Sequence, residues 1–227
     1  MSIPFFFYGK IEMVMKMKKW LLLFLCLMFV SCAKETMVYV AAISHLGILP
    51  YVDFRSSIDK HQDGVDDAND IIQTVRDYVA TDPIYKSVYY GGGYPDDGYG
   101  VCTDVVAFGL KGAGYDLRKL MEDHIENNRH LYDIEYVDWN IDFRRVNNQL
   151  IFFKHHFIEL TIDPKNISEW KPGDILVMDG HVGIVSDKRT SKGVPLVIHH
   201  TEKNPHIREE NLIETRNDIV AHFRVSN

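Results

Sequence analysis

Cysteine is scarce in this sequence, which has three in 227 residues: Cys26, Cys32 and Cys102. No Cys-x-x-Cys pair and no His-Glu-x-x-His motif is present, so the common zinc-ligand spacings are missing. Long apolar runs are missing as well. The unbroken run from Trp20 to Val30 covers 11 residues, whereas a membrane-spanning helix needs about 20. These absences argue against a disulfide framework, a zinc site of a common type and a membrane-spanning helix.

Positive charge is also in short supply. The chain has 25 Lys and Arg against 32 Asp and Glu, a formal net charge of −7. The first 31 residues hold four lysines and one glutamate, so the chain without them carries about −10. Such an acidic surface repels phosphate backbones, and no basic stripe interrupts it. We therefore expect no nucleic-acid partner.

The N-terminal residues 1–32 have the pattern of a bacterial export signal. Three lysines precede the apolar run (Lys16, Lys18 and Lys19). The run ends in Phe29-Val30-Ser31-Cys32, which resembles a lipobox, whose cysteine is lipidated and becomes the mature N-terminus. We expect a lipid anchor on Cys32, with residues 33–66 as a tether or extension. The alternative is ordinary signal cleavage near Ala33. Residues 1–12 read as an upstream mis-start, because a typical signal would begin at Met13, Met15 or Met17.

Cys102 is then the free thiol that remains in the exported chain. It follows a glycine-rich loop, residues 91–98, and precedes an apolar segment with helical spacing that stops at Gly112 to Gly114. The cysteine is therefore expected at a helix N-terminus, where unpaired N–H groups and the helix dipole favour a thiolate. This position predicts a nucleophile. The alternative is a small buried hydrophobic residue, since free cysteines are often buried.

The rest of the chain predicts an α+β domain over residues 67–227. Helices are expected at 68–80 and 117–128, on either side of the Cys102 helix, because apolar residues recur there at helical spacing. The apolar stretch 149–161 is interpreted as a strand and a turn. The later segments have a sequence pattern typical of a β-sheet, and strands are expected at 175–178, 181–186, 194–199 and 219–225.

The segment from Asp59 to Asp70 resembles a calcium-binding loop. Acidic residues stand at positions 1, 5, 9 and 12 of the pattern, and glycine stands at position 6. Position 3, however, is His61, a poor calcium ligand, and position 8 is Asp66 where a hydrophobic residue is usual. The preferred interpretation is a solvated acidic loop in which Asp66 or Asp67 caps the following helix.

Two histidines can complete a catalytic group with Cys102. His181 begins one expected strand after the turn Asp179-Gly180, and His199 ends the next. If these strands pair as a hairpin, the two imidazoles become neighbours on one face, whereas His200 points to the other face. A thiol nucleophile needs a base, and the base needs a group that orients it. The alternatives are ordinary surface or core histidines, or a zinc site. We expect neither metal nor cofactor.

Several ordered motifs resemble the DUF1287 family, a bacterial domain of unknown function. They are Tyr90-Gly91-Gly92-Gly93-Tyr94-Pro95, Gly100-Val101-Cys102-Thr103-Asp104, Asn140-Ile141-Asp142-Phe143-Arg144-Arg145, Trp170-Lys171-Pro172-Gly173-Asp174 and Gly180-His181-Val182-Gly183-Ile184-Val185. The family looks like a branch of the papain-like, NlpC-type cysteine hydrolases, which implies a helical half carrying the cysteine packed on an antiparallel sheet carrying the histidines. It implies Cys102 as nucleophile, His181 as base and His199 as the orienting residue.

The same resemblance implies further site residues and a substrate. Tyr90 falls where such enzymes often place a tyrosine near the oxyanion, and Asp104, Arg144 and Arg145 would shape the pocket. An arginine pair suits carboxylates of peptidoglycan stem peptides, although Arg144 and Arg145 can instead pair with Asp138 and Asp142. The expected function is an exported cysteine peptidase or amidase acting on the cell wall. Two alternatives are a non-catalytic wall- or peptide-binding lipoprotein and an acyltransferase.

Overall fold

A six-stranded antiparallel sheet organises residues 53–226, the part of the chain that the computed structural model describes. The strands lie in the order β3-β8-β4-β5-β6-β7. Their bounds are Ile158–Leu160 (β3), Ile175–Met178 (β4), His181–Arg189 (β5), Pro195–Thr201 (β6), Asn204–Glu210 (β7) and Ile219–Arg224 (β8). A separate parallel pair consists of Ile84–Tyr85 (β1) and Tyr99–Gly100 (β2). The predicted signal peptide, including Cys32, lies outside the described residues.

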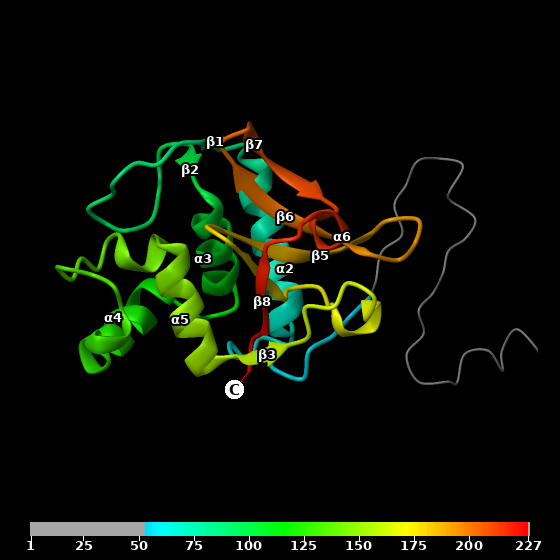
Figure 1. The fold of residues 1–227 in the computed structure, drawn as a ribbon, viewed down its shortest axis with the longest axis horizontal. Helices are drawn as coiled ribbons and strands as arrows, with labels where there is room; N and C mark the ends of the chain where they lie inside the picture. Colours follow the sequence, from blue (N-terminus) through cyan, green and yellow to red (C-terminus); the bar gives the residue numbers. More distant parts are fainter. Residues whose placement is uncertain (1–52, 227) are drawn as a thin grey trace, which may run out of the picture. The chain divides into compact units, whose positions relative to one another are not determined.

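Helices form most of the chain before the sheet and one short segment within it (Figure 1). They are Asp67–Ala80 (α2), Cys102–Gly112 (α3), Leu117–Asn127 (α4), Val146–His156 (α5) and Leu212–Thr215 (α6), with 3-10 turns at Arg129–Leu131 (η2), Asp142–Arg144 (η3) and Ile167–Glu169 (η4). None of the helices within residues 53–226 combines the length and apolar character needed to cross a membrane.

Most of the predicted elements are present. The expected helices at 68–80 and 117–128 correspond to α2 and α4, and the Cys102 helix is α3. The four expected strands correspond to β4, β5, β6 and β8. Asp66 caps α2 through its carboxylate, which accepts a hydrogen bond from the Asn69 backbone N–H. The α+β class, with an antiparallel sheet, is therefore confirmed.

The strand predicted over 149–161 is wrong for most of its length, because α5 continues to His156 and β3 is only Ile158–Leu160. The local run of Leu, Ile and Phe suits a strand, but side-chain contacts with η3 and with the start of α3 select the helix. The side-chain amide of Gln149 donates to the Phe143 and Thr103 carbonyls, and that of Asn148 donates to the Asp142 carbonyl. On a helix, these two residues share one buried face with Phe152 and Phe153.

The sheet has two differently covered faces. On the helix face, residues of the strands pack with Cys102 and other residues of α2 to α5; these strand residues are Ile175, Val177, Val182, Ile184, Ile198, Ala221 and Phe223. On the other face, which we call the cavity face, alternate residues pack with Trp170 and α6; they are Leu176, Met178, Val185 and Val197. The division thus places Val182, Ile184 and Ile198 on the helix face and Val185 and Val197 on the cavity face.

Close packing of α2 on α3 positions the N-terminus of α3. The two helices run side by side (Figure 1), and glycines of α3 lie against side chains of α2. A Cβ on Gly109 would lie 2.8 Å from Val75 Cγ2, and a Cβ on Gly112 would lie 1.8 Å from Thr74 Oγ1. Larger residues would force the helices apart, so these glycines set their separation.

Candidate active site

Cys102 is the first residue of α3, directly after β2, as predicted. Its side chain is buried, with 6% of the residue exposed. The backbone N–H groups of Val182 and Thr103 face the sulfur and lower its pKa, but burial outweighs them and raises the pKa to about 11. Burial therefore favours the neutral thiol, against the expectation that the helix N-terminus yields a thiolate. Desolvation of the charge costs more than the N–H groups return.

His181 and His199 form the histidine pair that the sequence predicts. β5 and β6 are antiparallel neighbours, and His181 Nε2 lies 2.9 Å from His199 Nδ1. Gly183 makes the approach possible, because a Cβ there would lie 3.1 Å from His199 Cβ and 2.8 Å from the Ile198 carbonyl oxygen. The predicted juxtaposition of the two imidazoles is confirmed; their chemical roles stay a prediction.

The hydrogen-bond chain assigns the tautomers of this pair. Glu210 on β7 lies behind His199, with His199 Nε2 3.4 Å from Glu210 Oε2. A carboxylate only accepts, so His199 carries its proton on Nε2 and its Nδ1 accepts from His181 Nε2–H. His181 is then left with an unprotonated Nδ1, the form of a base. Burial, with a smaller effect of the neighbouring His199, lowers the pKa of His181 to about 4, so this nitrogen stays unprotonated at neutral pH.

A cavity of about 470 Å³ opens beside the histidine pair. Its lining is mostly polar and carries charges of both signs: His181, His199, Thr201, Lys203, Asn204, Glu210, Leu212 and Arg216. Arg216 is held by an ion pair with Asp218. The cavity is large enough for a small peptide or a comparable ligand, so the two imidazoles line a solvent-accessible space.

The thiol does not face this cavity. His181 pairs with Met178, a cavity-face residue, whereas Cys102 packs with Val182 and Ile198 on the helix face. Within the described residues, the Cys102 sulfur forms no side-chain hydrogen bond, and it meets the backbone N–H of Val182, one residue along the chain from His181. These contacts place the sulfur among apolar side chains and the imidazoles along the cavity, and the predicted approach of the sulfur to both imidazoles stays a prediction.

Two residues that the sequence did not single out lie near Cys102. Tyr85 in β1 pairs with Gly100, two residues before the cysteine, and burial, followed by the neighbouring cysteine, raises the pKa of its hydroxyl. His200 contacts the Tyr85 ring edge-on at 5.2 Å and is fully buried. Its Nε2–H donates to the Pro205 carbonyl, and its Nδ1 has no partner. Strand alternation already predicted that His200 points to the opposite face of the sheet from His199. It did not predict that Cys102 packs on the same face as His200.

Asp104 and Arg144 form a buried ion pair. Arg144 donates through Nε and Nη2 to the two Asp104 oxygens at 2.7 and 2.8 Å, and through Nη1 to the Val88 carbonyl. Asp104 also accepts from the Val101 backbone N–H and so caps α3. The Arg144 side chain is 2% exposed. Its predicted role in binding substrate carboxylates is therefore wrong, because the guanidinium is enclosed and already paired.

The remaining predicted pocket residues, Tyr90 and Arg145, have partners of their own. The Tyr90 hydroxyl donates to Asp97, and its ring lies over the Arg144 guanidinium at 5.0 Å. The hydroxyl is thus already engaged, and Tyr85 is the tyrosine near Cys102. Arg145 is half exposed and lies 3.7 Å from Asp142, the partner that the sequence alternative named. Its role in substrate binding stays a prediction.

The fold and the site define an α+β protein with a buried cysteine at a helix N-terminus and a histidine pair on an antiparallel sheet. The family model for a domain of unknown function, DUF1287, matches residues 69–225, and the chain therefore belongs to this family. It is 35% identical over 152 residues to the uncharacterized protein YijF of Escherichia coli strain K12, covering 63% of this chain and 72% of that protein. No solved structure gives a significant match.

Proposed function

We propose that this protein is a thiol hydrolase of the papain-like, NlpC type that cleaves a peptide or amide bond in peptidoglycan. The observation that carries the proposal is the hydrogen bond between His181 and His199. Together with Glu210, it leaves one unprotonated nitrogen on an imidazole that lines the cavity. His181 is also next in the chain to Val182, whose N–H meets the Cys102 sulfur. A structural role alone does not require two neutral imidazoles and a carboxylate in series.

In the proposed reaction, Cys102 Sγ attacks the carbonyl carbon, and His181 Nδ1 receives the thiol proton. The carbonyl oxygen becomes an oxyanion held by backbone N–H groups at the start of α3. His181 then gives the proton to the departing amine, which leaves a thioester. Water attacks the thioester with His181 as base, releasing the carboxylic acid and restoring the thiol. Each proton that His181 takes up is returned, so the cycle closes.

The ground state has a neutral thiol and a neutral imidazole. The pKa of Cys102 is raised to about 11 and that of His181 is lowered to about 4, both chiefly by burial, so a preformed thiolate–imidazolium pair is disfavoured. Proton transfer must then accompany the attack instead of preceding it. Sulfur and imidazole must also approach each other when substrate binds; catalytic hydrogen bonds of unliganded enzymes are often formed only in the complex.

The test is digestion of purified muropeptides by the wild type, Cys102→Ser and His181→Ala. We expect new amine and carboxyl products from the wild type and at least a 100-fold slower rate from either variant. His206→Ala, an exposed histidine paired with Asp82, serves as the matched control and should retain full activity. Absence of products from every muropeptide would remove the cell-wall assignment.

The variant His200→Ala identifies the imidazole that serves Cys102. His200 shares the helix face with the cysteine and has an unpartnered Nδ1, whereas His181 lines the cavity. A hydrolase that loses activity in His200→Ala and retains it in His181→Ala would transfer the role of base to His200. Folding of each variant is checked by circular dichroism, since both histidines are largely buried.

A non-catalytic envelope peptide- or wall-binding protein is the second candidate, favoured by the burial of Cys102 on the apolar face. It predicts equal binding of wall fragments by the wild type and Cys102→Ser, with no turnover by either. An acyltransferase on the same scaffold would form the thioester but pass the acyl group to an amine or alcohol in place of water. Mass spectrometry of the products separates all three.

Export and lipid anchoring belong to the same proposal and are tested separately. Labelled palmitate should appear on the full chain and be lost in Cys32→Ser. An unlabelled wild-type chain would contradict the anchor and leave the hydrolase proposal standing.

A further inference from the structure

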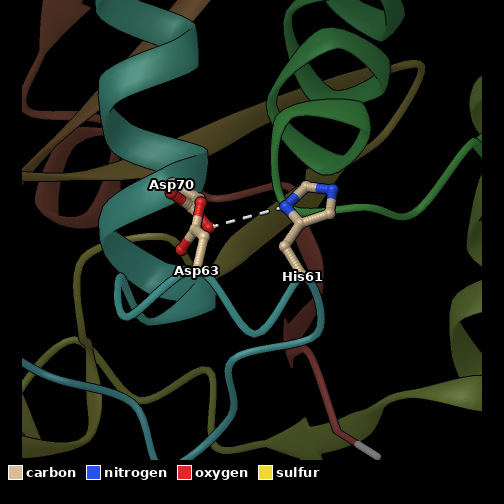
Figure 2. Close-up of side chains that lie close together, drawn as sticks. All are labelled: His61, Asp63 and Asp70. Atoms are coloured by element: carbon tan, nitrogen blue, oxygen red, sulfur yellow. Dashed lines mark ion pairs between the residues drawn. The ribbon is translucent and has the colours of Figure 1, made fainter.

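A second group of chemically active side chains lies at the start of α2. His61 and Asp63 come from the loop before the helix, and Asp70 comes from the helix itself (Figure 2). One ligand atom from each of the three lies within 4.8 Å of the others. The His61 Nδ1 atom is 3.9 Å from Asp70 Oδ2. His61 and Asp63 precede the segment that the family model matches, residues 69–225.

The His61 ring is positioned by the end of another helix. Gly114, which follows α3 with φ +85°, leaves space for the ring: a Cβ there would lie 2.8 Å from His61 Nε2 and 3.0 Å from Cδ2. The ring thus rests on the Gly114 backbone, and its Nδ1 is turned toward the two carboxylates (Figure 2). The nitrogen that faces the carboxylates is therefore aimed by packing.

Other acidic residues of the same loop have their hydrogen bonds provided within the protein. Asp59 accepts from the Asp63 and Gly64 N–H groups, Asp66 caps the helix, and Asp67 accepts from the Tyr115 hydroxyl and the Lys60 N–H. These carboxylates are therefore held by hydrogen-bond donors within the protein.

Asp70 differs from its neighbours. Its Oδ2 atom is buried and accepts no hydrogen bond within the described residues. Burial, and then the nearby carboxylates led by Asp63, raise the pKa of Asp70. Within residues 53–226, no lysine or arginine forms an ion pair with Asp63 or Asp70. A buried carboxylate oxygen without a donor, surrounded by like charges, is a position that a cation stabilises.

We propose that His61, Asp63 and Asp70 bind a divalent transition metal of the zinc class. A tetrahedral ion with bonds of about 2.0–2.2 Å places its ligands roughly 3.4 Å apart, close to the 3.9 Å between His61 Nδ1 and Asp70 Oδ2. The segment has the spacing of a calcium loop, but imidazole at its third position suits zinc, copper or nickel better than calcium, which takes oxygen ligands. His61 is 41% exposed, so water can complete the coordination.

Calorimetric titration of the full chain with Zn²⁺ tests the assignment, in a background with Cys26, Cys32 and Cys102 all replaced by serine, which removes the thiols. We expect one tight equivalent, weakened at least tenfold by His61→Ala and by Asp70→Asn. His206→Ala is the matched control, because His206 also pairs with an aspartate but has no second carboxylate near it. Asp63→Asn, on the exposed loop, replaces Asp70→Asn if that variant does not fold. Unchanged zinc affinity in His61→Ala, or no binding by the wild type, would overturn the proposal.

The variant His61→Asp separates a transition-metal site from a calcium loop. Replacing the nitrogen ligand by a carboxylate should weaken zinc binding and introduce calcium binding, because all the ligands are then oxygens. Calcium binding by the wild type that survives His61→Ala would show a carboxylate site and contradict the role of the histidine. Either result is independent of hydrolase activity at Cys102.

Discussion

The two faces of the central sheet treat ionisable groups in opposite ways. On the helix face, Cys102 and the Asp104–Arg144 pair are enclosed, and each charge is either matched or suppressed. On the cavity face, His181 and His199 reach a solvent-accessible space lined by charged side chains. Cys102 is thus removed from solvent, whereas the histidine pair lines the cavity. In the proposed hydrolase, the sulfur and the imidazole would have to come together from these two environments.

The largest expected effect comes from breaking the buried ion pair on the helix face. Arg144→Ala leaves the fully buried Asp104 carboxylate without its bidentate partner, and should lower the free energy of unfolding by about 3–5 kcal/mol. Urea unfolding followed by circular dichroism measures it. The neighbouring Arg145→Ala is the control, expected to cost less than about 1 kcal/mol because that side chain is half exposed. An equal loss of unfolding free energy in Arg144→Ala and Arg145→Ala would show that the buried ion pair contributes no more to stability than the exposed one.

The next effect belongs to the cavity face in acid. The folded-state pKa of His181 is lowered from 6.5 to about 4, and that of His199 is also lowered by burial. Between pH 6.5 and about pH 4, the unfolded chain binds more protons than the folded protein does. The free energy of unfolding that is present above pH 6.5 is therefore lost as the pH falls toward 4. His181 accounts for up to about 3 kcal/mol of this loss. Urea unfolding at pH 7 and pH 4.5 should show a smaller loss in His181→Gln than in the wild type, while His206→Gln behaves like the wild type.

The helix face should respond to alkali instead. The pKa of Cys102 is raised from 9.0 to about 11, so its contribution is complete below pH 9 and is lost as the pH rises toward 11. The loss is about 2–3 kcal/mol at most. Unfolding at pH 8 and pH 10.5 under reducing conditions, for the wild type and Cys102→Ala, isolates it from the tyrosines by difference. If the wild type and Cys102→Ala lose the same free energy of unfolding between pH 8 and pH 10.5, the thiol lies in a more polar environment than the helix face provides.

The smallest effect comes from the end of the histidine chain. Glu210 is about half exposed where it meets His199, so Glu210→Gln should change the free energy of unfolding by less than about 1 kcal/mol. Activity would respond more strongly, because the carboxylate sets the tautomers of His199 and His181. Nitrogen NMR of the imidazoles checks the tautomers. Unaltered shifts in both rings would remove Glu210 from the relay.

Local sequence signals predicted much of the fold and, at the candidate site, the helix that begins at Cys102 and the His181–His199 pair. The glycine loop followed by apolar helical spacing predicted a helix starting at Cys102, and Asp179-Gly180 predicted the turn that brings β4 and β5 together. The adjacency of His181 and His199 followed from the opposite directions of hairpin strands. These inferences succeed because turn chemistry and strand alternation depend on neighbouring residues alone.

Contacts between distant segments escaped the same reasoning. The helix α5 replaced a predicted strand because Gln149 donates to the Thr103 carbonyl, 46 residues away, in addition to the contacts that Gln149 and Asn148 make with the neighbouring η3. Arg144 was predicted to bind substrate, but it meets Asp104, 40 residues away. Near the start of α2, the spacing of the acidic residues suggested a calcium loop. Only the packing of the His61 ring on Gly114 shows that this histidine faces Asp70. Sequence spacing does not state which distant side chain will occupy a given space.

From the chain alone, one can derive an acidic α+β protein, the helix that begins at Cys102 and the pairing of His181 with His199, because propensity, turns and strand direction are local properties. Tertiary packing decided which face of the sheet became apolar and which stayed open. It thereby placed the thiol among apolar side chains and the imidazoles along the cavity. It also raised the pKa of Cys102 and lowered that of His181, because both shifts follow chiefly from the removal of each side chain from water.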